Sequence, residues 1–142
     1  MTGDDRPRIG IVIVAHGGLA EALLLATEHV VGAQDGMQAI AIGPNDDLRI
    51  CQNRIAQAVS DVRAGAGVIV VTDMFGGTPS NLAHAVMTES DVEVIYGANL
   101  PMLVKLAKMR CQPRVDAVRA ALDAGRKYVN SANAILDTEP AS

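Results

Sequence analysis

Aromatic residues are nearly absent from this chain. Of its 142 residues, two are tyrosine, one is phenylalanine and none is tryptophan, although hydrophobic residues make up 49% of the sequence. The core therefore has to be built from valine, isoleucine, leucine and alanine, and closely packed aliphatic side chains are typical of layered α/β folds. The length is that of one domain, and no repeat or linker divides it. We expect a single domain over residues 1–142.

Long apolar runs and an excess of basic residues are also missing. The longest runs, residues 9–15 and 67–72, are far shorter than the roughly 20 residues that cross a bilayer. The formal net charge is -4, without the clustered lysine and arginine that bind nucleic acid. Residues 1–8 are polar, with Asp4 and Asp5 where a secretory signal would be basic and then apolar. We expect a disordered start over residues 1–8 and a cytoplasmic protein that binds no nucleic acid.

Cysteine is rare as well. Cys51 and Cys111 are the two cysteines of the chain; they lie far apart, and each falls within a helical pattern. This spacing does not match a paired metal-ligand motif. We therefore expect two reduced, buried thiols and no metal site.

Alternating strand and helix patterns fill most of the chain. Continuous apolar, β-branched runs predict strands buried on both faces of a parallel sheet; these cover residues 9–14, 37–42, 67–72 and 92–96. Apolar side chains at helical spacing predict amphipathic helices between and after the strands, with first apolar positions at Leu19, Leu48, Leu82, Pro101 and Val115. Right-handed crossovers make this an α/β fold: a doubly wound, mainly parallel four-stranded sheet with helices on both faces.

Several local signals mark the boundaries of these elements. Asn45 or an adjacent aspartate is a candidate N-cap for the helix after the second strand. Thr78 is predicted as an N-cap, with Pro79 at the first helical position. Residues 129–136 are weakly strand-like but have no partner in the sheet, so exchange of this strand within a homodimer would cover exposed edges. Residues 137–142 are expected to form a tail.

The candidate site lies where the strands end. Ligands of open parallel sheets bind beyond the carboxyl ends of the strands, and His16 follows the first strand as Asp73 follows the third. Gly17 and Gly18 leave the ring of His16 unshielded. In a structural interpretation His16 is a satisfied core group and Asp73 a turn former. In a functional one, Asp73 accepts a hydrogen bond from one ring nitrogen and leaves the other nitrogen as a nucleophile.

A glycine-rich turn opens the helix after the third strand. Backbone N–H groups at Gly76, Gly77 and Thr78 would point outward with the positive end of the helix dipole, where a phosphoryl group can bind. The Thr78 hydroxyl can cap the helix or donate to an anion, and capping is the commoner role. No GK[ST] or GxGxxG follows, so ATP and NAD binding have no support. Met74 and Phe75 indicate either a protein-docking surface or packing within the loop.

Three segments, in this order, resemble the IIA component of the mannose family of the phosphoenolpyruvate-dependent sugar phosphotransferase system. They read IGIVIVAHGGLAEAL, VTDMFGGTPSNLA and IYGANLPML, and the resemblance spans residues 9–136. It implies a doubly wound fold, a homodimer that exchanges its last strand, and a phosphoryl carrier that needs no cofactor.

Matching motifs then assign roles to residues. The resemblance implies that His16 is the phosphorylated histidine and Asp73 its hydrogen-bonding carboxylate, the two catalytic residues. It places the anion-binding turn on Gly76, Gly77 and Thr78, and we add Gly17 to this phosphate-binding set.

The resemblance also implies partners. The phosphocarrier protein HPr would donate the phosphoryl group to His16, and an EIIB domain or protein would accept it for sugar uptake, which makes the chain a phosphotransferase. The chain ends at Ser142, so we expect EIIB to be a separate partner and contact with the membrane to run only through transporter components. Phe75 stands where many members carry tryptophan. An alternative is a regulatory EIIA of an incomplete system, whose phosphorylation state controls partner proteins.

Overall fold

The sheet is parallel throughout. The structure is a computed structural model that describes residues 6–74 and 76–137. Its sheet has the order β2-β1-β3-β4, and all three neighbouring pairs run in the same direction. The strands are β1 (Arg8–His16), β2 (Met37–Ile42), β3 (Gly65–Thr72) and β4 (Val92–Ile95). The predicted α/β class and four-stranded parallel sheet are confirmed. β1 begins at Arg8, within the stretch expected to be disordered, and residues 1–5 lie outside the described residues.

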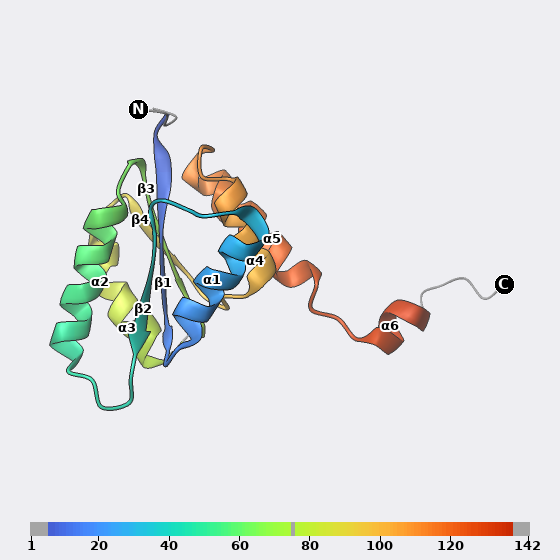
Figure 1. Ribbon diagram of the computed structural model, residues 1–142, viewed down its shortest axis with the longest axis horizontal. Coiled ribbons are helices and arrows are strands. Elements are labelled where there is room, and N and C mark those ends of the chain that lie inside the picture. The colour runs from blue at the N-terminus through green and yellow to red at the C-terminus, as the bar shows by residue number, and fades with distance from the viewer. Residues whose placement is uncertain (1–5, 75, 138–142) are drawn as a thin grey trace.

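Helices cover both faces of the sheet (Figure 1). α2 and α3 pack on one face, whereas α1, α4 and α5 pack on the other. The helices are α1 (Leu19–Val31), α2 (Leu48–Val62), α3 (Thr78–His84), α4 (Leu100–Lys108), α5 (Arg114–Lys127) and α6 (Ala132–Asp137), with a 3₁₀ turn, η1, over Ala85–Thr88. Since β2 lies on one side of β1 and β3 on the other, the strand order reverses between β1 and β3. Within residues 6–74 and 76–137, no helix is long and apolar enough to span a bilayer.

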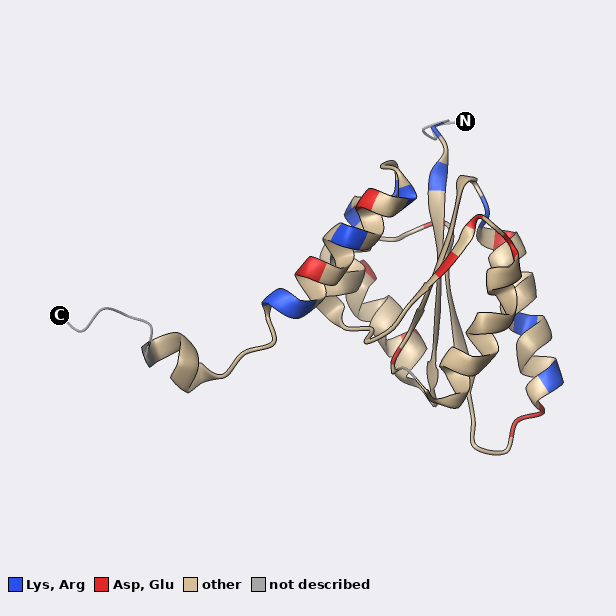
Figure 2. Cartoon of the chain, turned by 180° about the vertical axis from the view of Figure 1, so that it is seen from behind, with Lys and Arg blue, Asp and Glu red and all other residues tan. Residues whose placement is uncertain are grey.

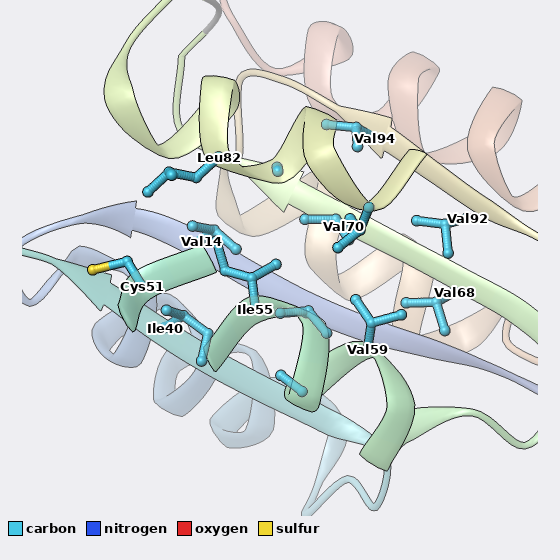
Figure 3. Packing of buried hydrophobic residues seen from close by; sticks show 14 of the residues in the cluster. Val14, Ile40, Cys51, Ile55, Val59, Val68, Val70, Leu82, Val92 and Val94 are labelled. Carbon is cyan, nitrogen blue, oxygen red and sulfur yellow. The ribbon is translucent and has the colours of Figure 1, made fainter. Parts of the chain in front are cut away.

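The core is aliphatic, as the composition requires. Alternate residues of β1 enter opposite layers. Val14 packs in the layer of α2 with Ile55 (Figure 3), and Ile13 packs in the layer of α4 with Leu103. Every residue from 9 to 15 is buried. Complete burial of one such side chain contributes about 1.5–3 kcal/mol. β1 is therefore a rigid base for the residue that ends it, His16.

The helix starts refine two predictions. Asp47 caps α2, because its Oδ1 accepts hydrogen bonds from the N–H groups of Arg49 at 2.9 Å and Ile50 at 3.4 Å. This confirms the expected aspartate cap. The prediction of Thr78 as an N-cap is wrong: the N-cap is Gly77 and Thr78 is the first helical residue. Ser80 closes this turn through its own hydroxyl, so the helix begins one residue earlier.

The C-terminal segment also differs from its prediction. A strand was expected over residues 129–136, but Ala132–Asp137 form the helix α6. The Oγ atom of Ser131 accepts from the N–H of Ala134 at 3.0 Å, and the carbonyl of Ser131 accepts from the N–H of Ile135. A short helix satisfies its backbone locally, whereas a strand needs a neighbour. Figure 1 shows α6 standing away from the sheet and its helices. The expected tail lies outside the described residues from 138 onward.

Candidate functional site

The strand order brings His16 and Asp73 together. His16 ends β1 and Asp73 follows β3, and these two strands are neighbours at the reversal of strand order. Two hydrogen bonds join the residues. Nδ1 of His16 lies 2.7 Å from Oδ2 of Asp73, and the backbone N–H of His16 donates to the same oxygen at 3.1 Å. One oxygen of Asp73 thus contacts both the backbone and the ring of His16, and this fixes the orientation of the imidazole.

The electrostatics of this pair define which ring nitrogen is available. Burial alone would raise the pKa of Asp73, but its hydrogen bonds with His16 outweigh burial and lower the pKa below its ordinary value. An ionised carboxylate only accepts, so Nδ1 carries the proton, and in the neutral imidazole Nε2 is then the nitrogen with the lone pair. Oδ1 of Asp73 is buried without a hydrogen-bond partner among the described residues. Hydrogen bonds with His16 therefore make the largest contribution to stabilising the ionised carboxylate.

Exposure differs sharply within the pair. The side chain of His16 is 51% exposed and that of Asp73 is 12% exposed. The carboxylate is protected inside the domain while the imidazole reaches the surface. An arrangement of this kind offers a nucleophilic nitrogen to a partner from outside and retains the charged orienting group within.

The glycine turn predicted to bind phosphate lies beside the ring. A Cβ atom built on Gly77 would lie 3.1 Å from Cε1 and 3.6 Å from Nε2 of His16. Gly76 has a φ of +88°, which an L side chain rarely adopts. Glycine is needed at both positions, for close approach at Gly77 and for backbone conformation at Gly76.

Ser80 holds this turn in place. Its buried hydroxyl accepts from the N–H of Gly76 and donates to the carbonyl of Gly77, both at 3.0 Å. The Gly76 N–H is therefore already engaged. The first N–H groups of an α-helix have no partner within the helix. α3 begins at Thr78, directly after the glycine whose backbone lies against the ring of His16.

Gly17 turns the chain away from the end of β1. Its N–H donates to the carbonyl of Ile42 at 2.9 Å, which extends the pairing of β1 with β2. Its φ of +56° turns the chain sharply after His16. The structure thus gives Gly17 a conformational role, and its N–H is not directed at the ring.

A small hollow adjoins His16. Its volume is about 200 Å³, and it is bounded by His16, Thr78 and the loop between β2 and α2. That loop was not identified from the sequence as part of the site, although it also follows a strand at the carboxyl edge. Asp46 in this loop accepts from the N–H of Gly43 at 2.6 Å, which folds the loop back on itself. The lining consists of His16, Gly17, Ile42, Gly43, Pro44, Asp46, Leu48 and Thr78.

Exposed apolar side chains surround this edge of the sheet. Leu19 begins α1, Leu48 and Ile50 lie in the first turn of α2, and Met74 follows Asp73; all four are exposed. We call these four residues the apolar rim. Phe75, for which the sequence left open a docking surface or packing within the loop, lies outside the described residues. Among residues 6–74 and 76–137, no cluster of three or more histidine, cysteine or acidic side chains is arranged to hold a metal ion.

Comparison with known proteins identifies the family. The chain matches the EIIA-man family model, described as the fructose IIA component of the PTS system, over residues 10–123. The mannose-specific EIIAB component of the PTS system from Escherichia coli K12 is 32% identical over 129 residues, which are 89% of this chain and 40% of that protein. The fructose-specific EIIA component of Bacillus subtilis is 27% identical over 103 residues, 72% of this chain and 70% of that protein. This chain spans less than half the length of the Escherichia coli relative.

Solved structures show the same fold. Component EIIA of the phosphotransferase system from Streptococcus agalactiae has a TM-score of 0.77 and 25% identity, and the match covers 87% of this chain and 96% of that one. The mannose/sorbose specific IIA subunit from Enterococcus faecalis has a TM-score of 0.79 and 24% identity, with 87% and 94% covered; this likeness is one of fold. The matched family region includes His16, Asp73 and the glycine turn. The chain therefore belongs to the EIIA-man family of phosphotransferase-system IIA components, as its three motif segments predicted.

Proposed function

We propose that this protein carries a phosphoryl group on Nε2 of His16 as part of a sugar phosphotransferase system. The supporting observation is the 2.7 Å contact between Nδ1 of His16 and Oδ2 of Asp73, which leaves the Nε2 lone pair free to attack phosphorus. The Nε2–P bond forms as the bond between phosphorus and the donor nitrogen breaks, and the donor keeps that electron pair. The ring of His16 gains positive charge in this step, and Asp73 stabilises it.

The surroundings of Nε2 suit a phosphoryl group. The backbone at Gly77 lies against the ring, and the N–H groups and dipole at the start of α3 favour an anion there. Thr78 lines the hollow next to His16, so its hydroxyl can donate to phosphoryl oxygens. We propose that Gly76 and Gly77 shape this cradle, that the start of α3 supplies the donors, and that Gly17 positions the ring.

Protein partners are expected on both sides of the transfer. We propose phospho-HPr as donor and an EIIB domain or protein as acceptor, as the family resemblance implies. The apolar rim supports this, because exposed apolar side chains around a reactive group are typical of a protein-docking surface. His16 at its centre is half-exposed, so a second protein can reach it. With these partners, the cytoplasm is the compartment in which we expect the protein to act.

We further propose that the protein is a homodimer in which the C-terminal segment of one protomer packs on the other. β4 is an edge strand of the sheet. Val129, Ile135 and Leu136 are large apolar side chains exposed on a segment that stands away from its own domain (Figure 1). Contact with a second copy would bury these side chains and cover the free edge.

Labelling tests the carrier function. Purified protein is incubated with labelled phosphoenolpyruvate, enzyme I and HPr, and acid-labile phosphate on the chain is measured. We expect His16→Gln to abolish labelling and His29→Gln, an exposed histidine on α1, to label normally. Label retained by the His16 variant would refute the assignment.

A discharge experiment tests the acceptor. Addition of EIIB to the phosphorylated protein is expected to remove the label from His16. The regulatory alternative predicts instead that a different protein is captured by only one phosphorylation state, so retention of the label in the presence of EIIB would contradict the transport role.

A further inference from the structure

A second hollow lies at the opposite, amino-terminal end of the sheet. It has a volume of about 270 Å³ and lies between the start of β1 and the end of α4. Figure 2 shows lysine and arginine segments gathered around the start of β1 and the neighbouring helical ends. The lining includes four basic residues and no acidic one; it comprises Arg6, Arg8, Gln34, Ala107, Lys108, Arg110, Cys111 and Gln112. We call it the basic hollow.

Arg110 forms the buried floor of this hollow. It is 5% exposed, and its guanidinium donates to carbonyl oxygens of three residues. Nε donates to Ile9 at 2.8 Å, Nη1 to Asp35, and Nη2 to Gly36 at 3.3 Å. A further contact joins Nη1 to the side-chain amide oxygen of Gln34 at 3.4 Å. All of these acceptors are neutral, so hydrogen bonds hold the guanidinium in place without cancelling its charge.

The charges around Arg110 are mostly of the same sign. Burial and then the charge of Arg8 lower the pKa of Arg110, against weaker opposing effects of Cys111 and Asp35. Within the described residues, the ion pairs join His16 with Asp73 and Arg63 with two acidic residues. None involves Arg8, Lys108 or Arg110.

The excess of positive charge around Arg110 is unusual for this molecule. Buried charges in proteins are ordinarily paired, and the chain as a whole is acidic, with a net charge of -4. The basic hollow instead gathers positive charge around a guanidinium that has no carboxylate partner among the described residues. An anion of matching size would supply the missing negative charge.

We propose that the basic hollow binds a small phosphate-bearing anion. Arginine and lysine side chains make charge-assisted hydrogen bonds to phosphate oxygens. Arg8 at the start of β1 and Lys108 at the end of α4 would both reach such a group, while Arg110, held by its backbone contacts, supplies a fixed positive charge. Several converging cations favour a dianion over a single carboxylate. The volume admits inorganic phosphate or a small phosphate ester. This site lies at the end of the sheet opposite His16 and does not depend on the carrier function.

Calorimetric titration tests this proposal, with inorganic phosphate and glycerol phosphate as probes and succinate as a dianion without phosphorus. We expect saturable binding of at least one phosphate compound and markedly weaker binding of succinate. The double variant Arg8→Gln/Lys108→Gln should bind about a hundredfold more weakly or worse, because each of the two lost charge-assisted hydrogen bonds is expected to contribute roughly a factor of ten or more. Lys105→Gln/Arg119→Gln removes the same charge from exposed positions outside the hollow and should bind like the natural chain.

The thiol of Cys111 can report whether the anion binds in this hollow. Contrary to the expected burial, this thiol is only partly buried and it lines the hollow, whereas Cys51 is buried elsewhere. Phosphate should slow alkylation of Cys111 by iodoacetamide in the natural chain but not in the Arg8→Gln/Lys108→Gln variant, as read by mass spectrometry of the two cysteine peptides. An unchanged alkylation rate, equally tight succinate binding, or full phosphate affinity in this variant would each overturn the proposal.

Discussion

Asp73 acts on His16 through a single oxygen atom. Oδ2 accepts both the ring N–H and the backbone N–H of His16, so the orientation of the imidazole follows from the position of one carboxylate. That position depends on β3, whose last residues are fully buried. At the scale of residues, the site consists of a nucleophile at the surface and an orienting charge beneath it.

Replacement of Asp73 by asparagine removes the charge and keeps the shape. We expect Asp73→Asn to slow phosphorylation of His16 by roughly ten- to a hundredfold, because a hydrogen bond to a charged group contributes about 1.5–3 kcal/mol and each 1.36 kcal/mol changes a rate tenfold. Rapid-quench labelling from phospho-HPr measures this rate. Asp123→Asn, on the exposed surface of α5, serves as the control. An unchanged rate in Asp73→Asn would mean that Asp73 only forms the turn after β3 and does not assist the transfer.

The same pair predicts a dependence of stability on pH. The pKa of Asp73 is lowered in the folded protein, so its contribution is present above the ordinary value of 3.8 and is lost as the pH falls through the lower, folded value. Urea unfolding between pH 7 and pH values below 3.8 should show a larger acid loss of stability in the natural chain than in Asp73→Asn. Equal losses in the two proteins would mean that the carboxylate contributes nothing to folding.

Gly77 offers a matched pair of substitutions. A Cβ atom at Gly77 would lie 3.1 Å from Cε1 of His16, whereas one at Gly18 would meet nothing within 4 Å. Both glycines have an ordinary negative φ, of -83° and -84°. We expect Gly77→Ala to displace the ring and slow phosphorylation severalfold, with a stability change of about 1 kcal/mol or less. Gly18→Ala should transfer normally. Equal rates in the two variants would show that the turn does not need its close approach to His16.

At the scale of elements, the start of α3 is the part of the site that depends most on one side chain. Ser80 lies in the first turn of α3 and bonds backward to Gly76 and Gly77. Helix and turn are therefore one unit, and the position of the turn relative to β1 is set by the packing of α3 on the sheet. The hydroxyl is buried, so water does not replace it.

Removal of that hydroxyl should separate positioning from stability. Ser80→Ala removes the partner of the Gly76 N–H, whereas the carbonyl of Gly77 still accepts from the N–H of Asn81. We expect a cost of about 0.5–1.5 kcal/mol in unfolding free energy, the usual contribution of one hydrogen bond. We also expect slower phosphorylation of His16 at saturating phospho-HPr, with little change in the HPr concentration at half-maximal rate, because the rim is unchanged. Ser80→Thr, which restores a hydroxyl, should recover the rate. If Ser80→Ala loses stability but transfers at the normal rate, the hydroxyl is structural only.

At the scale of the whole molecule, the sheet was predictable because its signal is strong and repeated. The β-branched runs of β1 and β3 can be buried only between two helical layers. The reversal of strand order follows from right-handed crossover connections through helices on both faces of the sheet. His16 and Asp73 were predicted from the sequence because of their place at the carboxyl ends of these strands: His16 is the last residue of β1, and Asp73 directly follows β3. Their pairing could be expected from topology, since neighbouring parallel strands end at the same edge.

The errors concern features that depend on distant partners. The N-cap of α3 depends on the side chain of Ser80, which offers the turn an alternative closure. Residues 129–136 are too short for periodicity to separate strand from helix, and their state depends on what they pack against. The basic hollow joins residues a hundred positions apart, so it emerges only in the folded chain.

The proposed dimer makes a prediction for the complete molecule. A chain that ends after Tyr128 lacks α6 and the exposed Val129, Ile135 and Leu136. We expect light scattering to show a dimer for the natural chain and a monomer for the shortened one, with His16 still phosphorylated, although more slowly if the dimer aids docking. A monomeric natural chain at micromolar concentration would contradict the exchange of this segment.

The central claim is that Nε2 of His16 is the atom that carries the phosphoryl group. Nitrogen-15 and phosphorus-31 nuclear magnetic resonance of the phosphorylated protein identify the bonded nitrogen directly. The geometry predicts one phosphohistidine, at His16, with phosphorus bonded to Nε2 and the proton retained on Nδ1 toward Asp73. Phosphorus on Nδ1, or on any other residue, would contradict the account.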